Sequence, residues 1–549
     1  MSTTPHLSLR HAAELLRAAN LLHEAIVPDR KAEKAEDAEG RVMDGADLWT
    51  IDPAALPDVE FTSVTYDSRS ITRGGLLFCK GGFRAEYLEG ADAAGLAAYV
   101  STTPYTTRTT AIGLIVSDDK AAMALLAAEY YGRPQDGLTV IGITGTKGKT
   151  TTAYFTQAIL NAATGTKCAL FSSVDNCTDG RTYEESQLTT PESLDLFRMM
   201  RQAVDAGMEY LVMEVSSQAY KVRRVHGLTF DVAAFLNISP DHVSPIEHPT
   251  FEDYFWCKRQ IVRNAKRLVL GAGMTHGNVV AQDAKACGVP FTTFAVDYPG
   301  DDAARPMHAD VALRLVHPGL PEFEFADAGA GAGTGGDARR FKLSMPGDFN
   351  VANAAAAIAI AQAVGIAQDS PVLRAIEDVR ISGRMELFQD SQDPNVIAYV
   401  DYAHNYVSVT ALLDFVHERY GSRNPRITLV TGSAGNKASD RRQGIIDAAQ
   451  DRIARLVLTS EDTDTESMQA IVDDMDSRVT NPSLIHDKIL DRTAALEDAI
   501  ADARKDAEAH GRLNVVLAIG KGREKWIKLR NKHVPYESDT GVIARVFAR

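Results

Sequence analysis

The sequence predicts an α/β protein of three domains. Short apolar runs rich in Val, Ile and Leu alternate with longer helical patterns, first in the middle of the chain and again towards its C-terminus. Runs that are apolar throughout indicate strands of a parallel sheet that helices cover on both faces. The 549 residues also exceed what one hydrophobic core organises and suggest roughly two to four domains. Turn-rich segments place the domains at 1–135, 136–378 and 379–549.

Composition and charge exclude several classes of protein. Apolar residues make up 45% and charged residues 24%, as in ordinary globular proteins. The net charge of −15 disfavours a nucleic-acid backbone or an anionic membrane as the main partner. Five scattered cysteines, none in CxxC spacing, indicate neither a disulfide framework nor a zinc knuckle. Without a signal-peptide or membrane-spanning pattern, we expect a cytoplasmic protein with no membrane insertion.

Four local features flank the main strand and helix patterns. An amphipathic helix is predicted around Leu9 and Leu16, and a mostly alanine core helix over 351–367. Residues 30–41 form a mixed-charge run that we expect to be a solvated insertion. The Gly-rich stretch 327–340 separates FEFA from FKLSM, two alternating segments that can pair as a hairpin. Neither biased stretch is assigned a function.

The two strand-rich regions have the βαβ rhythm of nucleotide-binding folds. In the central region the predicted strands are 138–143, 210–215, 231–237 and 267–271, with helices from about Thr150 and over 251–264. In the last region they are 396–405, 426–436, 454–462 and 514–522. Each region therefore predicts its own parallel sheet, the second one Rossmann-like.

The sharpest local signal is IGITGTKGKTT, residues 141–151, where a buried strand runs into a Gly-rich turn and a helix start. Backbone N–H groups of such a loop cradle phosphates, Lys149 can reach the β- and γ-phosphates, and Thr150 can ligate Mg²⁺. The match is not literal, because Ile143 stands where the general pattern has Gly and Gly145 lies inside the loop. A turn without ligand is the alternative, which the strand–loop–helix context disfavours.

Further along the chain, Glu214 and His242 are candidates for a metal site, and Lys258 is a third residue of interest. Glu214 ends a strand at the edge where such folds bind ligands, although a strand-terminal Glu is more often solvated or capping. His242 follows the next strand and can be a metal or phosphate ligand or a structural residue. Composition alone predicts that Lys258 is a surface lysine whose stem lies beside Trp256.

Polar residues of the last domain also follow its predicted strands, at one edge of the sheet. They are Asp401, Tyr402 and His404, Asn436 and Lys437, and the GKGRE segment 520–524. Glu461, Asp462 and Asp464 place three acids on one further loop. Such a cluster suits a cationic amine, Mg²⁺ or no ligand at all.

Taken together, these motifs resemble the Mur ligases, ATP-dependent enzymes that extend the peptide stem of the peptidoglycan precursor. The resemblance covers nearly the whole chain through YDSRSITRGGLLFCKGG, TGTKGKTT, LTTPESLDLF, MEVSSQAY, FDVAAFLNISPDHVSPIEHPTFEDYFWCKR, GDFNVANAAAA, SGRMELF, VDYAHN, GSAGNK and GKGRE. It implies a central P-loop domain that binds ATP, an N-terminal domain for a UDP-sugar peptide and a C-terminal domain for an amino acid. The chain is most similar to members that add L-lysine, as the third residue, to the D-Glu of UDP-N-acetylmuramoyl-L-Ala-D-Glu through an acyl phosphate.

The resemblance implies roles for individual residues. Those matched to the UDP-substrate are Ser68, Thr189, Thr190, Ser216 and Arg224. Those matched to ATP are Gly145, Thr146, Lys147, Gly148, Lys149, Thr150, Thr151, Asn350, Asn353, Arg384, Asp401, Tyr402 and His404. Those matched to Mg²⁺ are Thr150, Glu214, His242 and Lys258; the last three, with Lys149, are the expected catalytic residues. Those expected to contact the incoming amino acid are Glu461, Asp462, Asp464, Gly520, Lys521 and Glu524.

The resemblance also replaces the surface interpretation of Lys258. The matched lysine of the family is carbamylated, and addition of CO₂ turns a neutral amine into a carboxylate-like anion that can hold Mg²⁺ through oxygen. We therefore expect ATP, Mg²⁺ and a CO₂-derived carbamate on Lys258 as cofactors, with small-molecule substrates and a monomeric enzyme.

Two departures from the family pattern bear on specificity. Lys147 stands where many members have Asn, which adds a cation near phosphate. The selecting motif reads Glu461, Asp462, Thr463, Asp464 and lacks the arginine of diaminopimelate-adding members. An acidic loop favours L-lysine or L-ornithine, which differ by one methylene worth about 1–3 kcal/mol in a fitted pocket.

Alternative functions remain at this stage. The same reaction with L-ornithine or meso-diaminopimelate is the nearest. A folylpolyglutamate synthetase shares the phosphate loop and the modified lysine, but LTTPES and DSRS match the UDP-substrate side of Mur ligases. A noncatalytic nucleotide-binding protein is less favoured, and a nucleic-acid motor least, because basic tracts are absent from the sequence.

Overall fold

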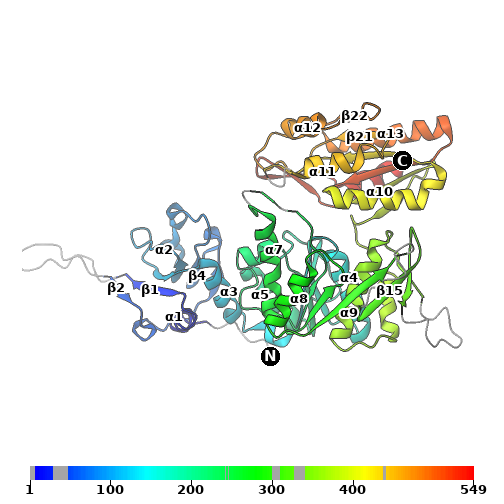
Figure 1. The fold of residues 1–549 in the computed structure, drawn as a ribbon. Helices are drawn as coiled ribbons and strands as arrows, with labels where there is room; N and C mark the ends of the chain where they lie inside the picture. Colours follow the sequence, from blue (N-terminus) through cyan, green and yellow to red (C-terminus); the bar gives the residue numbers. More distant parts are fainter. Residues whose placement is uncertain are drawn as a thin grey trace, which may run out of the picture. The chain divides into compact units, whose positions relative to one another are not determined.

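The α/β architecture predicted from the sequence is confirmed by the computed structural model (Figure 1). The structure describes residues 7–28, 47–241, 243–244, 247–298, 309–326, 340–436 and 440–548. Three principal sheets hold the fold, with six, eleven and six strands, and a two-stranded hairpin is added near the C-terminus. Internal contacts divide the chain into two compact units, one of Met1–Ile143, Ala163–Ala233 and Arg263–Lys266, the other of Thr144–Ala162, Ala234–Val262 and Arg267–Arg549. Each principal sheet falls within one predicted domain, whose boundaries remain predictions.

The first sheet has the strand order β2-β1-β6-β5-β4-β3. Its strands are β1 (Leu22–Val27), β2 (Leu48–Thr50), β3 (Ser63–Thr65), β4 (Gly75–Phe78), β5 (Ala98–Ser101) and β6 (Ile112–Val116). Strands β3 to β6 are parallel, and β1 adds antiparallel to β6. The helices and 3-10 turns of this region are α1 (Leu9–Ala18), η1 (Pro53–Ala55), η2 (Ser68–Ser70), η3 (Ala85–Leu88), α2 (Ala91–Ala94), α3 (Asp119–Tyr130) and η4 (Pro134–Gly137).

The second sheet runs β10-β9-β8-β11-β7-β12-β13-β14-β15-β16-β17. Its strands are β7 (Thr139–Thr144), β8 (Cys168–Phe171), β9 (Asp175–Cys177), β10 (Glu184–Glu185), β11 (Tyr210–Glu214), β12 (Val232–Phe235), β13 (Leu268–Gly271), β14 (Phe291–Asp297), β15 (Val311–His317), β16 (Leu320–Phe325) and β17 (Arg340–Lys342). Its helices are α4 (Lys149–Thr164), α5 (Ser193–Asp205), α6 (Ser217–Lys221), α7 (Phe251–Arg259), α8 (Gly277–Ala286) and α9 (Phe349–Ala363), with 3-10 turns η5 (Gln260–Asn264) and η8 (Pro371–Ile376).

The third sheet has the order β18-β19-β23-β20-β21-β22, and all its neighbours except β18 and β19 are parallel. Its strands are β18 (Glu386–Gln389), β19 (Val396–Asp401), β20 (Arg426–Thr431), β21 (Arg455–Leu458), β22 (Ile485–Lys488) and β23 (Asn514–Ile519). Its helices are α10 (Tyr406–Tyr420), α11 (Asp440–Ala449), α12 (Met468–Ser477), α13 (Arg492–His510) and α14 (Asp539–Phe547), with the turn η9 (Gly421–Arg423). The hairpin β24 (Trp526–Leu529) and β25 (Lys532–Pro535) follows β23.

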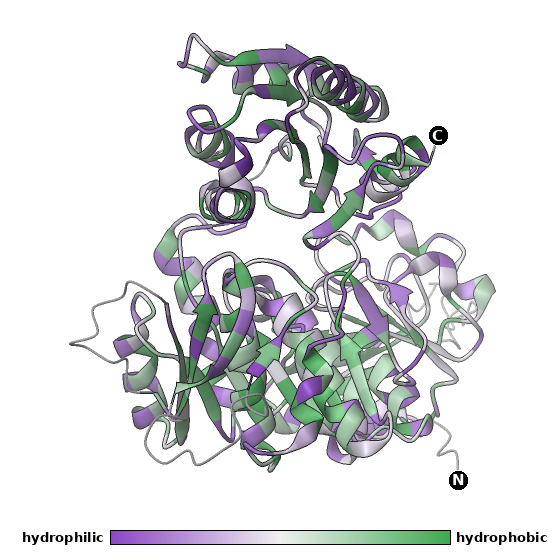
Figure 2. Cartoon of the chain, turned by 90° about the vertical axis from the view of Figure 1, so that its right-hand side faces the viewer, coloured by the Kyte–Doolittle hydropathy of each residue, from purple (hydrophilic) through white to green (hydrophobic). Residues whose placement is uncertain are grey.

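Both faces of the third sheet are buried, as the apolar runs predict. Along β23, Val515 and Leu517 join one hydrophobic cluster with α10, α11 and α12, whereas Val516 and Ala518 join another with α13 and α14. Successive side chains of a strand point to opposite faces, so a strand covered on both sides must be apolar throughout. The strands accordingly carry much of the hydrophobic colour in Figure 2.

Several local predictions are also confirmed. Helix α1 buries Leu9 and Leu16, and the alanine-rich segment forms the buried helix α9. The segments FEFA and FKLSM pair as predicted, with Phe323 opposite Phe341 in β16 and β17. The connection 327–339 between them and the mixed-charge run 30–41 lie outside the described residues.

Two further observations concern the cysteines and the helices. All five cysteines are free thiols, and four of them are buried. In the described part of the chain, no helix combines the length and the apolar character needed to cross a bilayer.

The close contact between Gly142 and the ring of Phe230 gives a test of the packing on the central sheet. A Cβ at this position of β7 would lie 2.7 Å from ring atoms of Phe230. Gly142→Ala should therefore destabilise the protein by about 1–3 kcal/mol through overpacking, seen as a lower urea midpoint. Gly137→Ala is the control, because its Cβ would meet Val204 at an ordinary 3.6 Å. Equal midpoints for the two variants would contradict this account of the packing.

Candidate active site

The predicted phosphate loop connects β7 to α4 and is braced by one asparagine. Asn237 Oδ1 accepts hydrogen bonds from the N–H groups of Thr146 at 3.1 Å and Lys147 at 2.9 Å, and Asn237 Nδ2 donates to Lys147 O at 3.0 Å. Gly148 has φ +84°, and a Cβ there would collide with Asn353 Oδ1. Glycine is therefore required at this position by backbone conformation and by space.

Two lysines donate to the same carbonyl oxygen of this loop. Lys149 Nζ, at the first position of α4, donates to Gly145 O at 3.0 Å and to Thr146 O at 3.2 Å. Lys258 Nζ, from α7, donates to Gly145 O at 2.8 Å and lies 4.9 Å from the centre of the Tyr254 ring. The surface position expected from composition is wrong, because Lys258 is only 2% exposed, while Trp256 is 52% exposed. The seventh helix buries the face that carries Lys258 and turns Trp256 to solvent.

The predicted ATP asparagines lie together at the start of α9. Asn350 Nδ2 donates to Pro346 O at 2.7 Å, and Asn353 Nδ2 donates to Asn350 Oδ1 at 2.9 Å. Because the amide of Asn353 lies against Gly148, this pair is part of the wall of the phosphate loop. Thr150 and Thr151 are buried in the first turn of α4.

On β11, the predicted metal ligand Glu214 is joined to two predicted UDP-substrate residues. Its side chain is buried and accepts a hydrogen bond from Ser173 N at 2.8 Å. Its backbone oxygen accepts one from Thr190 Oγ1 at 3.0 Å, and Thr190 Oγ1 in turn accepts one from Ser216 N. Glu214 pairs in register with Ile143, so it lies at the carboxyl end of the sheet, where α/β folds bind ligands.

Of the other UDP-substrate residues, Arg224 is engaged in an ion pair that the sequence did not predict. Its guanidinium donates to Glu192 Oε1 at 3.0 and 2.8 Å, and Lys80 Nζ donates to Glu192 Oε2 at 2.6 Å. Ser68 lies in the turn η2, and Thr189 is half-buried before Thr190. Lys80 lies in the motif YDSRSITRGGLLFCKGG and Glu192 in LTTPESLDLF, and nothing in the sequence distinguishes either from an ordinary surface charge.

The unusual Lys147 lies in a polar cluster around Asp241. Lys147 Nζ is 3.4 Å from His404 Nε2 and 3.6 Å from Asp241 Oδ2. Arg441 donates to Asp241 Oδ1 at 2.8 Å and 3.1 Å, and Asn405 Nδ2 donates to Asp241 Oδ2 at 3.0 Å. Burial lowers the pKa of Lys147 to about 8 and that of His404 well below its usual range.

Sequence reasoning singled out Lys147 and His404 but missed Asp241, Asn405 and Arg441. Asp241 precedes His242 in the quoted motif NISPDHVSPIEH, and only the fold shows that it gathers cations from separate segments. His404 Nδ1 is 2.6 Å from Tyr402 O, which leaves Nε2 facing Lys147.

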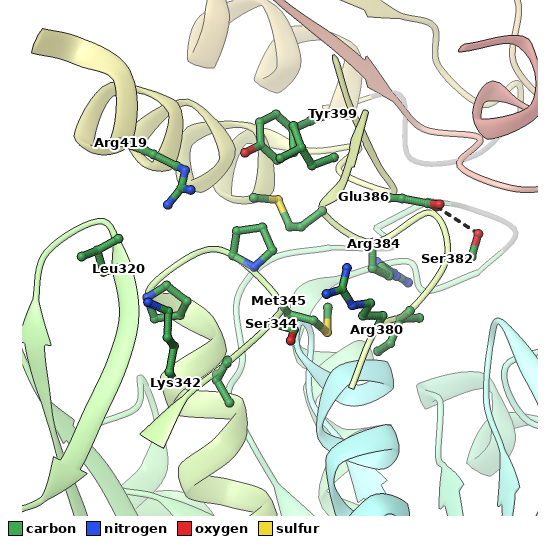
Figure 3. Close-up of a pocket in the computed structure, with 16 residues that line it drawn as sticks. Leu320, Lys342, Ser344, Met345, Arg380, Ser382, Arg384, Glu386, Tyr399 and Arg419 are labelled. Atoms are coloured by element: carbon green, nitrogen blue, oxygen red, sulfur yellow. Dashed lines mark hydrogen bonds between the residues drawn. The ribbon is translucent and has the colours of Figure 1, made fainter. Parts of the chain in front are cut away.

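A cavity of about 690 Å³ lies beside Arg384, with Lys342, Arg380 and Arg419 among its lining residues (Figure 3). Its volume is within the usual range for small-molecule sites. The Arg384 guanidinium stacks over the Tyr402 ring at 4.6 Å, and its Nε is buried without a hydrogen-bond partner in the described structure. An acceptor on a ligand would satisfy this donor.

Asp401 is held beside this cavity by backbone donors. It accepts hydrogen bonds from Met385 N at 2.9 Å and Ala403 N at 2.7 Å. Burial raises the pKa of its carboxyl. The predicted ATP residues thus form a phosphate-loop group and an Arg384 group, and Lys147 and His404 link the two.

The acidic loop predicted to take a substrate amine is already largely neutralised by lysines of the chain. Asp462 Oδ1 accepts from Lys521 Nζ at 2.9 Å, and Lys521 also forms a short ion pair with Glu524. Asp464 Oδ1 lies 2.6 Å from Lys528 Nζ on the hairpin strand β24. That all three acids contact an incoming amino acid stays a prediction, and two of them already hold a lysine of the chain.

Glu461 is the acid of this loop that stays open. Within the described residues its carboxylate has no hydrogen-bond or ion-pair partner, and burial raises its pKa. A Cβ at Gly520 would lie 2.7 Å from Glu461 Oε2, so the two loops are in contact. Burial raises the pKa of Glu524 to about 7, against the opposing effect of Lys521.

Two of the residues predicted to bind Mg²⁺, taken one at a time, have suitable chemistry. Thr150 offers a hydroxyl and Glu214 a buried carboxylate, both hard oxygen donors of the kind that Mg²⁺ prefers. His242 and Lys437 lie outside the described residues, so the part of His242 in a metal site stays a prediction.

Two parts of the chain match models of known protein families. Residues 143–361 match the family model of the Mur ligase middle domain, and residues 383–522 match that of the Mur ligase glutamate ligase domain. A UDP-N-acetylmuramyl-tripeptide synthetase of Bifidobacterium longum is 57% identical over 98% of this chain and 99% of its own length. The chain belongs to the Mur ligase family. These matches confirm the resemblance inferred from the motifs. Mur ligases are ATP-dependent enzymes.

Two further comparisons place this Mur ligase among its relatives. A UDP-N-acetylmuramoyl-L-alanyl-D-glutamate--L-lysine ligase of Enterococcus faecalis is 40% identical, covering 87% of this chain and 90% of its own. A solved structure of a UDP-N-acetylmuramoyl-L-alanyl-D-glutamate--2,6-diaminopimelate ligase covers 89% of this chain and 95% of its own with a TM-score of 0.55. At 21% identity, that structure supports the fold alone.

The position of Lys147 predicts an unusual titration. Its pKa should be about 8 instead of the ordinary 10.5. Because the folded protein then releases this proton before the unfolded chain does, this group makes stability rise with pH between those two values. Titration of ¹³C-methylated lysines by NMR, with Lys147→Arg to assign the signal, measures the pKa directly.

A charge change beside Lys147 supplies the control for this titration. Asp241 raises the pKa of Lys147, so Asp241→Asn should lower it further. A midpoint above 10 in the native enzyme, or a rise in Asp241→Asn, is the result that contradicts the described cluster.

Proposed function

We propose that this Mur ligase adds L-lysine to UDP-N-acetylmuramoyl-L-Ala-D-Glu. The γ-phosphoryl of ATP passes to the side-chain carboxylate of D-Glu, which gives an acyl phosphate and ADP. The α-amine of L-lysine attacks the acyl carbon, and an amide forms as phosphate leaves and the amine loses a proton. The observation that carries the ligase chemistry is the phosphate loop with two lysines, Lys149 and Lys258, on one carbonyl.

Lys149 supplies the cation for phosphoryl transfer. Gly145 O and Thr146 O hold its ammonium at the loop, where it can offset the charge that spreads over the transferred group. Thr150, Glu214 and, by the family pattern, His242 and Lys258 would hold Mg²⁺. When bound, Mg²⁺ neutralises charge on the phosphates. This family uses ATP and Mg²⁺.

Carbamylation of Lys258 is supported by the charges around it. As an ammonium, Lys258 lies against the same carbonyl oxygen as Lys149, and two like charges in one buried place repel each other. A carbamate on Lys258 would replace this repulsion by attraction, while its N–H could still donate to Gly145 O. The modified side chain would also present oxygens to Mg²⁺.

Recognition of L-lysine is proposed to rest on Glu461 with Glu524. Glu461 is the open carboxylate of the loop, and no arginine stands in the segment 461–464 to pair the extra carboxylate of diaminopimelate. The identity to the L-lysine ligase of Enterococcus faecalis favours the same choice. A folylpolyglutamate synthetase is disfavoured, because the curated relatives of high identity and coverage carry tripeptide-forming names.

We further propose that the predicted domains divide the work and that the enzyme is a cytoplasmic monomer. Residues 1–135 would hold the UDP-sugar, 136–378 ATP and 379–549 the amino acid. Thr190, Ser216 and Arg224 would contact the UDP-substrate, whose negative charge suits Arg224. The free cysteines support a reducing compartment.

The reaction is tested with the UDP-muramoyl-dipeptide, ATP-Mg²⁺ and, separately, L-lysine, L-ornithine and meso-diaminopimelate. Phosphate release and the mass of the product should show the largest kcat/KM for L-lysine, with L-ornithine about 10- to 200-fold lower, the range for one methylene. Preferred turnover of diaminopimelate would refute the use of the acidic loop. ATP binding without turnover of any amine would instead favour a noncatalytic nucleotide-binding protein.

Removal of the modified lysine gives a second test. Lys258→Ala should lower kcat by roughly 10²–10³-fold or more, because a buried electrostatic group of the site is lost. Added short carboxylic acids should restore part of the activity by supplying the missing carboxylate. Lys285→Ala changes an exposed lysine on α8 and is the matched control. Full activity in Lys258→Ala without rescue is incompatible with the carbamate role.

A further inference from the structure

A fully buried arginine outside the predicted site ties its two amino-acid loops together. Arg492 is the first residue of α13, and its side chain is 0% exposed, as is that of its ion-pair partner Asp539. No motif of the family resemblance includes either residue. Their burial is unusual, because charged side chains are rarely fully buried unless they are paired and hydrogen-bonded.

The Arg492 guanidinium donates four hydrogen bonds. Nε and Nη2 each donate to the Asp539 carboxylate at 2.7 Å. Nη1 donates to Ser460 O at 3.1 Å, and Nη2 also donates to Ile519 O at 2.7 Å. Tyr536 OH donates to Asp539 Oδ1 at 2.7 Å, which orients the carboxylate.

The two carbonyl acceptors are placed immediately before the amino-acid loops. Ser460 precedes Glu461 after β21, and Ile519 ends β23 before Gly520. These strands are not neighbours, because β20 lies between them in the sheet. Arg492 therefore reaches across one strand and joins two loops that the sheet itself does not connect.

Asp539, the ion-pair partner of Arg492, also binds the far end of the segment 520–522. Asp539 N donates to Gly522 O at 3.0 Å, so the segment 520–522 is anchored before and after its glycines. Gly520 has φ +103° and Gly522 φ +57°, backbone conformations that need external restraint to stay in one arrangement. Across the loop, Glu461 Oε2 lies over Gly520.

We propose that Arg492 is a positioning residue for the amino-acid pocket of this ligase, acting with Asp539. It touches no substrate and sets the separation of the Glu461 loop from the 520–524 loop. The inference rests on the proposed function for its substrate, and on the hydrogen bonds alone for its structural part. A lysine cannot replace it, because a single ammonium lacks the planar fork that serves two carbonyls and a carboxylate at once.

The kinetic test compares two substrates of one enzyme. In Arg492→Lys, the KM for L-lysine should rise at least about tenfold, while the KM for the UDP-dipeptide stays within about twofold. The reason is that a shift of the Glu461 and 520–524 loops weakens binding only of the substrate that these loops contact. Asp539→Asn should shift the same parameter in the same direction, and it serves if Arg492→Lys does not fold. Equal rises in both KM values, or no rise for L-lysine, overturn the proposal.

The matched control is Arg455, the first residue of β21, the strand whose other end leads to Ser460. Arg455 donates to Asp487 at 2.8 Å and to Asp498 at 2.6 Å and lies 3.3 Å from Asp502, so it is also a nearly buried arginine among acids. Arg455→Lys should leave the KM for L-lysine within about twofold. A rise equal to that of Arg492→Lys would show a general effect of charge loss and overturn the positioning role.

A second readout separates this proposal from the proposed reaction. If the native enzyme turns over none of the three amino acids, the proposed function fails, and amide hydrogen exchange decides the role of Arg492. Exchange at residues 461 and 520–522 should quicken in Arg492→Lys and not in Arg455→Lys. Unchanged protection of these amides overturns the proposal.

Discussion

The site of this enzyme depends on two buried acceptors, Gly145 O and Asp241, each of which holds more than one cation. Gly145 O accepts from both Lys149 and Lys258, and Asp241 holds Lys147 and Arg441 and also accepts a hydrogen bond from the amide of Asn405. Phosphate chemistry needs positive charge in place before the substrate arrives, and like charges in a protein interior repel. The glycine loop, Asn237 and Asp241 are the groups that make this arrangement stable without the nucleotide.

Most of the fold could be predicted from the sequence, because strands buried on both faces leave continuous apolar runs. Strands β7 and β11 lie within one residue of the predicted segments, whereas β20 and β23 begin at the predicted residues 426 and 514 but end several residues before the predicted ends. The position of these loops at one edge was likewise predictable, since parallel strands all end there, and their role in binding ligands stays a prediction. Burial of Lys258 was not, because helix α7 carries exposed and buried aromatic residues side by side and its periodicity is weak.

The polar partners were the part that spacing could not reveal. Glu192, Asp241 and Arg492 each join residues far apart in the chain, and only the fold brings such residues into contact. The acidic loop shows the same limit in the other direction. Its composition indicates an amine site, yet Lys521 and Lys528 come from a later segment and neutralise two of its three acids. A charge count along the sequence cannot distinguish an open carboxylate from one paired at a distance.

The internal pairing of Lys521 has a consequence for how an amino acid reaches the enzyme. Lys521 is 1% exposed, bonded to Asp462 and Glu524, and its ammonium lies 4.3 Å from the centre of the Trp526 ring. Charges paired in this way and screened by salt project little field beyond a Debye length of about 8 Å. Under the proposed function, these paired groups would therefore add little long-range attraction for a free diamino acid. On the same proposal, discrimination would begin when its side chain is close enough to exchange water for the carboxylate of Glu461.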